Sequence, residues 1–357
     1  MSSGETSHVG ARPASLLAVR LSPADVGRRV TVRHKLDDRV LTDVVGTLLA
    51  WSGGWSGRLV VERRDGASVA VAATSVVAAK VVPPQLSAEA LQAVAESGWP
   101  PDERAELGGW TLRASGGVTD RANSVRVAGR PGLPLDATLE RVARWYGDRR
   151  LPPLLQLPVP SAYDDPLAAR GWVVARRTVL CTASTADVRR VATAAPGVVT
   201  VRSTTPSAQW LALAEPDLDP DALTRILVRP AGVVFVEARD ASTGLLLGTG
   251  RASPAGSPVG RWAGVTSILT APTARRRGVA RAVMGELAAW AEENRCPHSY
   301  LQTPASNEPA AAPYDALGFV AHHTYAYLAA SLPAAPAGDT PGTVARARPA
   351  HPPGSDL

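Results

Sequence analysis

Hydrophobic and polar positions between residues 198 and 330 follow helical spacing in some segments and form extended runs in others. The clearest helix is Ala280–Asn294, where hydrophobic residues three or four positions apart form one face: Val279, Val283, Leu287 and Trp290. The other predicted elements are strands at 198–202, 233–238, 245–251, 262–270, 299–303 and 321–328, and helices at 206–214 and 220–228. The pattern therefore predicts an α/β domain.

A basic turn joins the strand at 262–270 to this helix. Its sequence is Arg275-Arg276-Arg277-Gly278-Val279-Ala280. Gly278 allows the backbone to approach a ligand closely, and the N–H groups and positive dipole end of the following helix point toward the turn. A diphosphate can bind there, and the arginines add positive charge. For these residues alone, the alternative is a helix cap with a surface arginine cluster.

Two other nucleotide-binding motifs are excluded. A Walker A loop requires Gly-x4-Gly-Lys-Ser/Thr, which the chain lacks. A dinucleotide fingerprint requires three glycines, whereas this turn contains only Gly278. The turn therefore predicts a different kind of diphosphate-containing cofactor.

A second motif follows downstream. In the segment 305–319, the residues Asn307, Tyr314, Gly318 and Phe319 have the spacing Asn-x6-Tyr-x3-Gly-Phe. Together with the basic turn, this order resembles the GCN5-related N-acetyltransferase (GNAT) family over residues 198–330. The resemblance implies an α/β (α+β) GNAT fold, with a mixed sheet flanked by helices.

The resemblance also implies a cofactor and a site. The co-substrate is acetyl-CoA, and no metal is implied. Backbone groups at a strand bulge are implied to contact the pantetheine arm, and one N–H there to polarise the thioester carbonyl. The implied cofactor-binding residues are Ile268, Leu269, Thr270, Arg275, Arg276, Arg277, Gly278, Val279, Ala280, Arg281 and Asn307. Tyr314 is the implied catalytic acid that protonates the leaving thiolate.

The sequence assigns no general base. Gln302 stands where some ribosomal-protein acetyltransferases of the resembled family have glutamate, and glutamine cannot accept the proton at neutral pH. Glu237 could act through water, or could be a solvated strand residue. His322 and His323 are neighbours on a predicted strand, so at most one is expected to face the site.

The N-terminal region is predicted to be all-β after a flexible lead at residues 1–22. Five short strands are predicted at 29–35, 42–50, 59–62, 68–72 and 76–82, with a hairpin turn at 64–67. They predict an SH3-like barrel over residues 23–84, which resembles the N-terminal barrel of some actinobacterial GNAT proteins. Trp51 and Trp55 are expected to cover the end of the barrel core, or alternatively to form a recognition surface.

Residues 85–190 resemble a degenerate copy of the C-terminal region. Arg170-Gly171-Trp172-Val173 parallels Leu317-Gly318-Phe319-Val320, and each precedes a long closing strand. The copy has Leu167 at the position that matches Tyr314, and prolines within 129–134 remove N–H donors. It is predicted to bind no cofactor. Its glycine-rich loop 116–124 either lines an acceptor site or is an ordinary hairpin loop.

Composition adds a few limits. The two cysteines, Cys181 and Cys296, are far apart and predict neither a disulfide framework nor a zinc site. The chain has no apolar run of about 18 residues and no signal peptide, which predicts a cytoplasmic protein without a membrane partner. The net charge of +6 is carried almost entirely by arginine and does not favour a nucleic-acid partner. The Pro/Ala/Gly-rich tail at 331–357 is predicted to be disordered.

The predicted function is an N-acetyltransferase that transfers the acetyl group of acetyl-CoA to an amine of a protein or a small molecule by direct attack. The alternative is an acetyl-CoA-binding regulatory or interaction protein without turnover. The sequence identifies neither the acceptor nor the oligomeric state.

Overall fold

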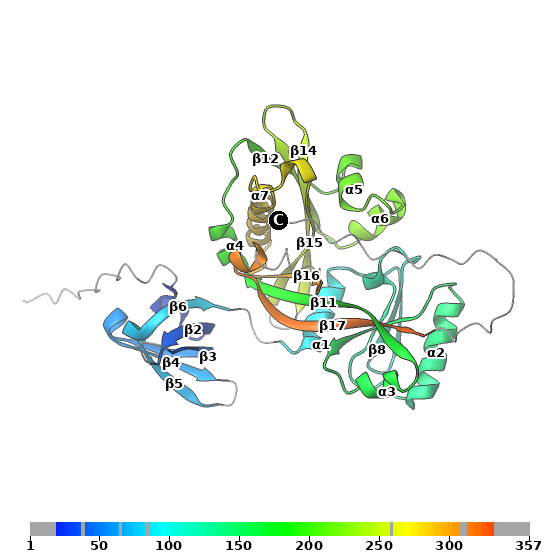
Figure 1. Cartoon of the computed structure of the whole chain (residues 1–357), viewed down its shortest axis with the longest axis horizontal. Helices are drawn as coiled ribbons and strands as arrows, with labels where there is room; N and C mark the ends of the chain where they lie inside the picture. The colour runs from blue at the N-terminus through cyan, green and yellow to red at the C-terminus, as the bar shows by residue number, and fades with distance from the viewer. Residues whose placement is uncertain are drawn as a thin grey trace, which may run out of the picture. The chain divides into compact units, whose positions relative to one another are not determined.

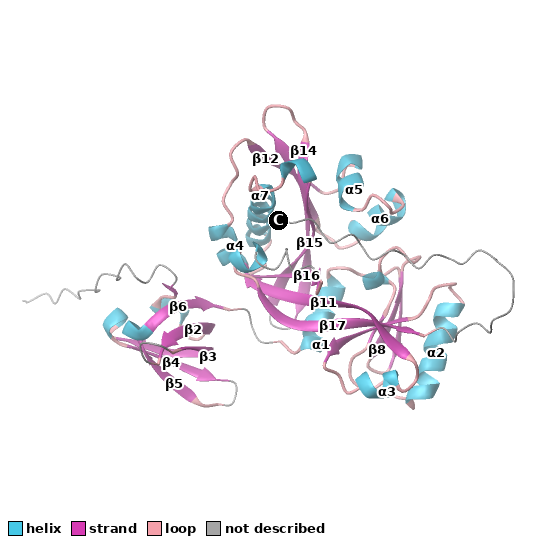
Figure 2. Cartoon of the chain, viewed as in Figure 1, coloured by secondary structure: helices cyan, strands magenta, loops and turns pink. Residues whose placement is uncertain are grey.

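The structure, a computed structural model, describes residues 19–36, 40–63, 66–82, 86–257, 260–306 and 313–331. The chain divides into two compact units, residues 1–85 and 86–357. Figure 1 follows the chain through both units, and Figure 2 shows that the first is almost entirely strands and the second mixes strands with helices.

The first unit is a small barrel-like sheet with strand order β1-β6-β2-β3-β4-β5. The strands are β1 Val19–Arg20, β2 Arg29–Lys35, β3 Leu41–Ser52, β4 Arg58–Arg63, β5 Ser68–Ala72 and β6 Val76–Val81. Alternating residues such as Val30, Val32 and Leu48 are fully buried and form the core. Trp51 packs against this core, as one of the two interpretations expected. The Trp55 side chain and residues 64–65 of the predicted hairpin turn lie outside what the structure describes.

One prediction for this unit is wrong at Val19 and Arg20. Residues 1–22 were expected to be a flexible lead, but β1 pairs in parallel with β6, with Val19 opposite Ala79. Two residues are too short to show a hydrophobic period, so only the neighbouring strand reveals the pairing. Residues 1–18 lie outside the described range.

The second unit is built on one sheet with strand order β12-β13-β14-β15-β16-β11-β17-β10-β9-β8-β7. Its strands are β7 Glu103–Leu107, β8 Trp110–Ala114, β9 Val125–Arg126, β10 Leu154–Val159, β11 Trp172–Ser184, β12 Val198–Ser203, β13 Val234–Asp240, β14 Leu246–Ser257, β15 Gly260–Thr270, β16 His298–Pro304 and β17 Val320–Ala330. Its helices are α1 Ala88–Ser97, α2 Leu135–Gly147, α3 Asp164–Ala168, α4 Thr185–Val191, α5 Ala208–Ala214, α6 Pro220–Leu227 and α7 Val279–Glu293.

The two halves of this sheet exchange their closing strands. In each half, two strands pair in parallel: β9 with β10, and β15 with β16. The closing strand of the first half, β11, pairs with β16 of the second, whereas β17 pairs with β10 of the first. β11 and β17 also pair with each other, as the long crossing strands in Figure 1 show. The halves therefore form one continuous sheet.

Helices cover both faces of the C-terminal half, with α4 and α7 on one face and α5 and α6 on the other (Figure 1). α7 packs closely on β14 because glycine occupies two positions there. A Cβ added to Gly250 would lie 2.4 Å from Val283 Cγ1, and one added to Gly248 would lie 2.6 Å from Val279 Cγ1. The sheet consequently fixes the position at which α7 begins.

Candidate functional site

The site begins where two parallel strands separate. β15 and β16 pair from Trp262 and His298 as far as Val265 and Leu301, and no pairing follows within the described residues. Beyond this point β16 stays paired with β11, while β15 follows β14. The edge of β15 that faces β16 is therefore left with unpaired backbone groups, which can bind an extended ligand.

A bulge in β15 lies directly after the last paired residue. The register with β14 shifts between Thr266 and Leu269, and Ser267 has a positive φ of 55°. The Thr249 hydroxyl donates a hydrogen bond to the Ser267 carbonyl at 3.1 Å and holds the bulge in place. Extra residues of this kind redirect a strand and its backbone groups.

The residues after the bulge direct their side chains to the two faces of the sheet. Ile268 packs against the core beneath α7, and Leu269 packs with the cluster beneath α5 and α6. Their backbone groups are thus available to face the opening. The Thr270 hydroxyl is buried and has no hydrogen-bond partner among the described residues, which fits a group that binds a ligand.

The basic turn has the backbone geometry of an anion site. Arg276 and Gly278 both have left-handed backbone conformations, with φ of 59° and 76°. Gly278 is the N-cap of α7, and the first bond inside the helix runs from Ala282 N to Gly278 O. The N–H groups of the first turn therefore have no acceptor within the helix, and no acidic residue stands there to neutralise the dipole.

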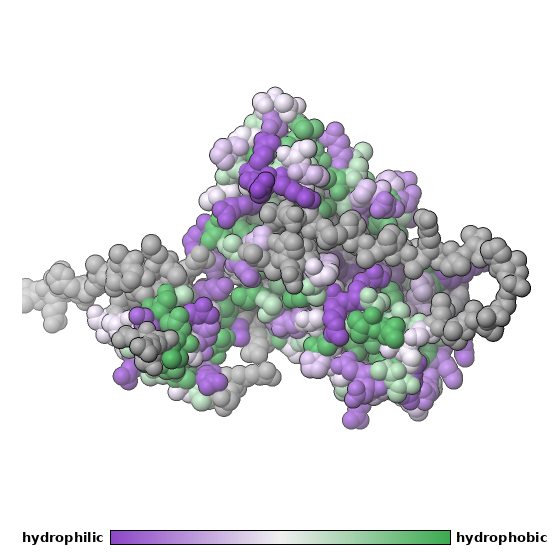
Figure 3. Space-filling view, in the orientation of Figure 1, coloured by the Kyte–Doolittle hydropathy of each residue, from purple (hydrophilic) through white to green (hydrophobic). Residues whose placement is uncertain are grey.

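The arginines of this turn are exposed to different degrees. Arg276, Arg277 and Arg281 are exposed, whereas Arg275 is half-buried. Arg277 Nη2 lies 3.4 Å from Asp240 Oδ2, which ties the turn to the end of β13. Figure 3 shows hydrophilic residues gathered over the end of the sheet where Figure 1 draws α7 and β14. Positive charge and helix geometry thus coincide at one position.

Tyr314 packs against the core cluster that contains Val265 and Leu301, the last paired residues of β15 and β16, and Cys181 packs against the same cluster. The Tyr314 ring centroid is 6.1 Å from that of Phe319. Burial, and next the nearby Cys181, raise the pKa of Tyr314 to about 12, so its hydroxyl keeps its proton at neutral pH. Burial also raises the pKa of the Cys181 thiol to about 11, so this cysteine is not an activated nucleophile. Asn307 lies outside the described residues.

Gln302, which stands at the position of the glutamate base, and the candidate base Glu237 both make hydrogen bonds within the protein. Gln302 Oε1 accepts a hydrogen bond from the buried Tyr325 hydroxyl at 2.6 Å. Glu237 accepts from Arg239 Nε at 2.8 Å and from the Ser207 hydroxyl. These contacts favour a structural role for Glu237, which is one of the two interpretations that the sequence left open.

His322 and His323 do not point to opposite faces of β17, which was the basis for expecting at most one of them to face the site. β17 carries a bulge at His322, because Leu180 pairs with His323 and Cys181 pairs with Ala321. The bulge breaks the alternation of faces, so both rings lie together, with Nδ1 atoms 2.9 Å apart and ring centroids 5.1 Å apart. Adjacent sequence positions alone could not reveal this.

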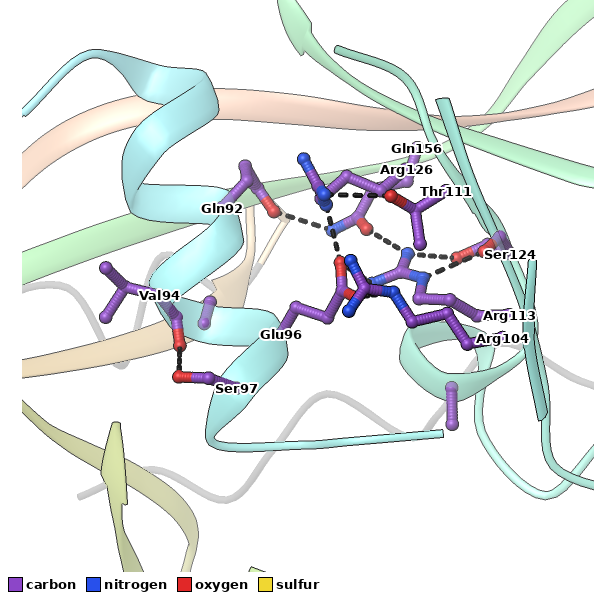
Figure 4. A network of polar contacts seen from close by, with 12 residues as sticks. Gln92, Val94, Glu96, Ser97, Arg104, Thr111, Arg113, Ser124, Arg126 and Gln156 are labelled. Carbon is purple, nitrogen blue, oxygen red and sulfur yellow. Dashed lines mark hydrogen bonds and ion pairs between the residues drawn. The ribbon is translucent and has the colours of Figure 1, made fainter. Parts of the chain in front are cut away.

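A chain of hydrogen bonds fixes the protonation of His323. Figure 4 shows its first part, in which Arg113 donates to Gln156 and Gln156 is bonded to Gln92. Because arginine can only donate, Gln156 must accept through Oε1 and donate through Nε2 to Gln92 Oε1, at 2.8 Å. Gln92 Nε2 then donates to His323 Nε2 at 3.0 Å, which leaves the ring proton on Nδ1.

The same series of hydrogen bonds determines where a neutral His322 carries its proton. The His323 Nδ1–H donates to His322 Nδ1, so a neutral His322 carries its own proton on Nε2. In this state neither ring has an unengaged acceptor nitrogen. Geometry therefore argues against both histidines as the general base.

The pH dependence of the free energy of unfolding tests whether His323 is held neutral in this way. Burial, and next His322, lower the pKa of His323 from 6.5 to about 4. In the unfolded chain this imidazole binds a proton below about pH 6.5, whereas in the folded chain it does so only below about pH 4. The free energy of unfolding should therefore decrease as the pH falls from about 6.5 to about 4. We expect His323→Gln to remove about 2 kcal/mol of the stability difference between pH 7 and pH 4.5, allowing for partial exposure of the ring. Chemical denaturation at both pH values measures it, and equal pH dependence in the two proteins would contradict the assignment.

The loop 116–124 is more ordered than a hairpin turn requires. Asn123 Oδ1 accepts from the N–H groups of Ser115 and Gly117, at 2.7 and 2.9 Å. The Thr119 hydroxyl accepts from Trp99 Nε1 at 3.2 Å. Arg121 lies over the Trp99 ring, as does Arg251 of β14. Trp99 and Arg251 were missed by the sequence analysis, because a single buried arginine in a strand has no motif.

Comparison with known proteins places the chain in a family. A family model described as "Probable histone acetyltransferase Rv0428c C-terminal" matches residues 88–328. The Mycobacterium tuberculosis (strain ATCC 25618 / H37Rv) protein "Probable histone acetyltransferase Rv0428c" is 30% identical over 321 residues, which are 85% of this chain and 95% of that protein. The chain belongs to the Rv0428c family.

Two solved structures resemble the Rv0428c-family chain. The GCN5-related N-acetyltransferase from Kribbella flavida has a TM-score of 0.50 and 19% identity, covering 67% of this chain and 92% of that one. A tandem GNAT protein from the clavulanic acid biosynthesis pathway has a TM-score of 0.47 and 15% identity, covering 70% and 89%. The Kribbella likeness, together with the mixed sheet and its flanking helices, confirms the GNAT fold expected from the motifs.

The N-terminal unit of the Rv0428c-family chain has its own match. A family model described as "Rv0428c N-terminal Sm-like domain" matches residues 24–80. The all-β fold is as predicted, and the matched family describes it as Sm-like rather than SH3-like. Within the described residues, no helix is long and apolar enough to cross a membrane, and no group of His, Cys, Asp or Glu could hold a metal ion.

Proposed function

We propose that the chain is an acetyl-CoA-dependent N-acetyltransferase that acts on an amine of a protein or a small molecule. The left-handed backbone at Arg276 and Gly278, at the start of α7 and next to the opening between β15 and β16, carries this proposal. In the proposed complex, the pyrophosphate of acetyl-CoA accepts hydrogen bonds from the backbone N–H groups at residues 276–281, and the arginines surround it. Ile268, Leu269 and Thr270 contact the pantetheine arm, and Asn307 adds a further contact.

The proposed reaction is a direct transfer. Bound acetyl-CoA supplies an activated thioester, and a backbone N–H near the Ser267 bulge polarises its carbonyl oxygen. The neutral amine nitrogen forms a bond to the carbonyl carbon, and the carbon–sulfur bond breaks. Tyr314 gives its proton to the departing thiolate, the amine loses a proton to solvent, and solvent returns a proton to the Tyr314 phenolate. The half-buried thiol of Cys181 plays no covalent part.

The second candidate is a cofactor-binding protein without turnover. The engagement of Gln302, Glu237 and both histidines in other hydrogen bonds favours it, because it leaves none of these four described residues as an evident base. A substrate amine that is already neutral would not need such a base. Detection of free CoA with an amine panel separates the two functions.

We further propose that residues 85–190 are a degenerate GNAT half without a cofactor. The first turn of α2 contains Asp136, which disfavours an anion there, whereas the first turn of α7 contains no acid. The segment before α2 is also filled by protein: Gly109 N donates to Arg130 O at 2.7 Å, and the Tyr163 hydroxyl donates to Gly129 O at 2.8 Å. No equivalent diphosphate cradle remains.

Calorimetric titration with acetyl-CoA tests this division. One molecule should bind per chain, and a protein of residues 86–357 should bind with the same affinity, because it keeps the turn, the bulge and its own core. A stoichiometry of two would contradict the degenerate half. Loss of binding in a folded 86–357 protein would instead show that the barrel contributes to the cofactor site.

A further inference from the structure

Arg251 is a buried cation without a counter-ion. It lies on β14 with no exposed surface, and its Nε donates to Leu227 O at 3.0 Å. Its Nη1 makes only long contacts, of 3.5 Å to Ser253 Oγ and 3.4 Å to Thr266 Oγ1. Its Nη2 is buried and has no hydrogen-bond partner, and no carboxylate among the described residues pairs with it. Such a group is costly to bury, so a missing anion is indicated.

Arg113 provides a comparison within the same molecule. It is equally buried, but Glu96 Oε2 lies 3.9 Å from its Nη1, and Ser124 and Gln156 accept its other hydrogen bonds. Figure 4 shows Glu96 among Arg104, Arg113 and Arg126. Where the chain buries this other arginine, it therefore supplies a carboxylate itself. Around Arg251 it supplies none.

A second arginine lies over the same tryptophan ring. The guanidinium carbons of Arg121 and Arg251 lie 4.9 and 4.8 Å from the centroid of the Trp99 ring. Arg121 Nε is also buried and has no hydrogen-bond partner. Cation–π contacts with Trp99 position both groups but do not neutralise them. Two unneutralised guanidinium groups attract an anion, and they repel a lysine-rich segment.

The position of this pair places it near the proposed reaction. Arg251 is opposite Thr266, the last residue before the Ser267 bulge. Trp99 follows Gly98, the C-cap of α1, which packs so closely on the sheet that an added Cβ would lie 2.4 Å from the Tyr300 hydroxyl. Arg121 is half-buried and lies on the loop 116–124, so part of its side chain is exposed to solvent.

We propose that Arg251 and Arg121 bind a carboxylate of the acceptor, which is therefore an amine that also carries a carboxylate group. The free Nη2 of Arg251 and Nε of Arg121 supply the hydrogen bonds, which are strong because both partners are charged. Trp99 fixes the planes of the two guanidinium groups. The acceptor part of this inference rests on the proposed acetyl transfer, whereas the carboxylate site does not.

The test measures binding of a simple probe to the full-length chain. Succinate is titrated by calorimetry at constant ionic strength, with uncharged succinamide as the matched compound. Succinate should bind and succinamide should not. Arg251→Gln and Arg121→Gln should each weaken succinate binding at least tenfold. Arg251→Lys should weaken it less. Arg225→Gln, which changes an exposed arginine of α6, should not weaken it at all.

Acetyl-CoA affinity, measured on the same samples, separates the two proposals. This affinity should be the same in every variant as in the wild type. If the wild type does not bind acetyl-CoA at all, the proposed function is wrong, but the succinate result still tests the carboxylate site. If Arg251→Gln does not fold, Arg121→Gln carries the test alone, because its side chain is on the loop. No succinate binding by the wild type, equal binding by folded variants, or tighter binding of inorganic phosphate than of succinate would overturn the carboxylate site.

Discussion

Tyr314→Phe is expected to lower turnover roughly 10²-fold or more and to leave the affinity for acetyl-CoA unchanged. The substitution keeps the ring that packs against Phe319 and the core, and it removes only the hydroxyl. If that hydroxyl protonates the leaving thiolate, its loss should cost the factor typical of general acids. Steady-state rates of CoA release and calorimetric affinities measure both quantities.

The pKa of Tyr314 adds a second readout. Because burial raises this pKa to about 12, the hydroxyl stays protonated throughout the usual assay range, and turnover should show no decline from its ionisation up to about pH 10. Tyr163→Phe, which removes a hydroxyl near the start of α3, is the matched control and should keep wild-type turnover. Wild-type turnover in Tyr314→Phe would leave Tyr314 as a packing residue.

Gly278→Glu is expected to weaken acetyl-CoA binding by more than tenfold, about 1.4 kcal/mol or more, with the fold kept. The new carboxylate would lie at the N-terminus of α7, where it competes with the diphosphate for the same N–H groups. The residue also has a φ of 76°, which a side chain tolerates poorly. Calorimetry with acetyl-CoA measures the loss.

Gly171→Glu is the matched control, because it places glutamate at another left-handed glycine far from the turn. It shows how much of the lost affinity comes from backbone strain rather than from a carboxylate at the start of α7. Gly171 has a φ of 75°, and a Cβ there meets nothing within 4 Å, so the backbone cost is similar. It precedes β11, away from α7, and its substitution should leave acetyl-CoA affinity unchanged. Equal affinities of the wild type and Gly278→Glu would mean that the diphosphate does not bind at this turn.

Local patterns were sufficient to predict most of the C-terminal elements. The helix at 280–294 and the strand at 262–270 appear as α7 and β15 with nearly the same bounds. Both could be predicted because each has a clear hydrophobic pattern and a clear end in the sequence. The position of Gly278 at the N-cap also follows from sequence, because glycine alone adopts that backbone conformation at little cost.

Other features depend on contacts between distant segments. The exchange of β11 and β17 between the halves cannot be read from either strand, since both have the same alternation whichever partner they choose. The bulge at His322 is set by the register with β11, and the pairing of β1 by the position of β6. Arg251 gains its importance only because the chain brings Trp99 and Arg121 to it.

The helix α4 and the strand β7 were also missed. β7 has no clear apolar alternation, because Glu103, Arg104 and Glu106 are exposed on both of its faces, and it lies at the edge of the sheet. α4 has only seven residues, which is too short for a helical period to be distinct. In both cases the neighbouring element, β8 or α7, provides the stabilising contacts.

The most direct test of acetyl transfer is product analysis after mixing the full chain with acetyl-CoA and a panel of amines. The panel pairs carboxylate-bearing amines with their carboxamides and includes a lysine-containing peptide. Free CoA and the N-acetylated amine are quantified together, by a thiol reagent and by mass spectrometry. The proposed function predicts equal amounts of both products from at least one amine, and their loss in Tyr314→Phe. Bound acetyl-CoA without any acetylated amine would contradict catalysis and favour the binding protein.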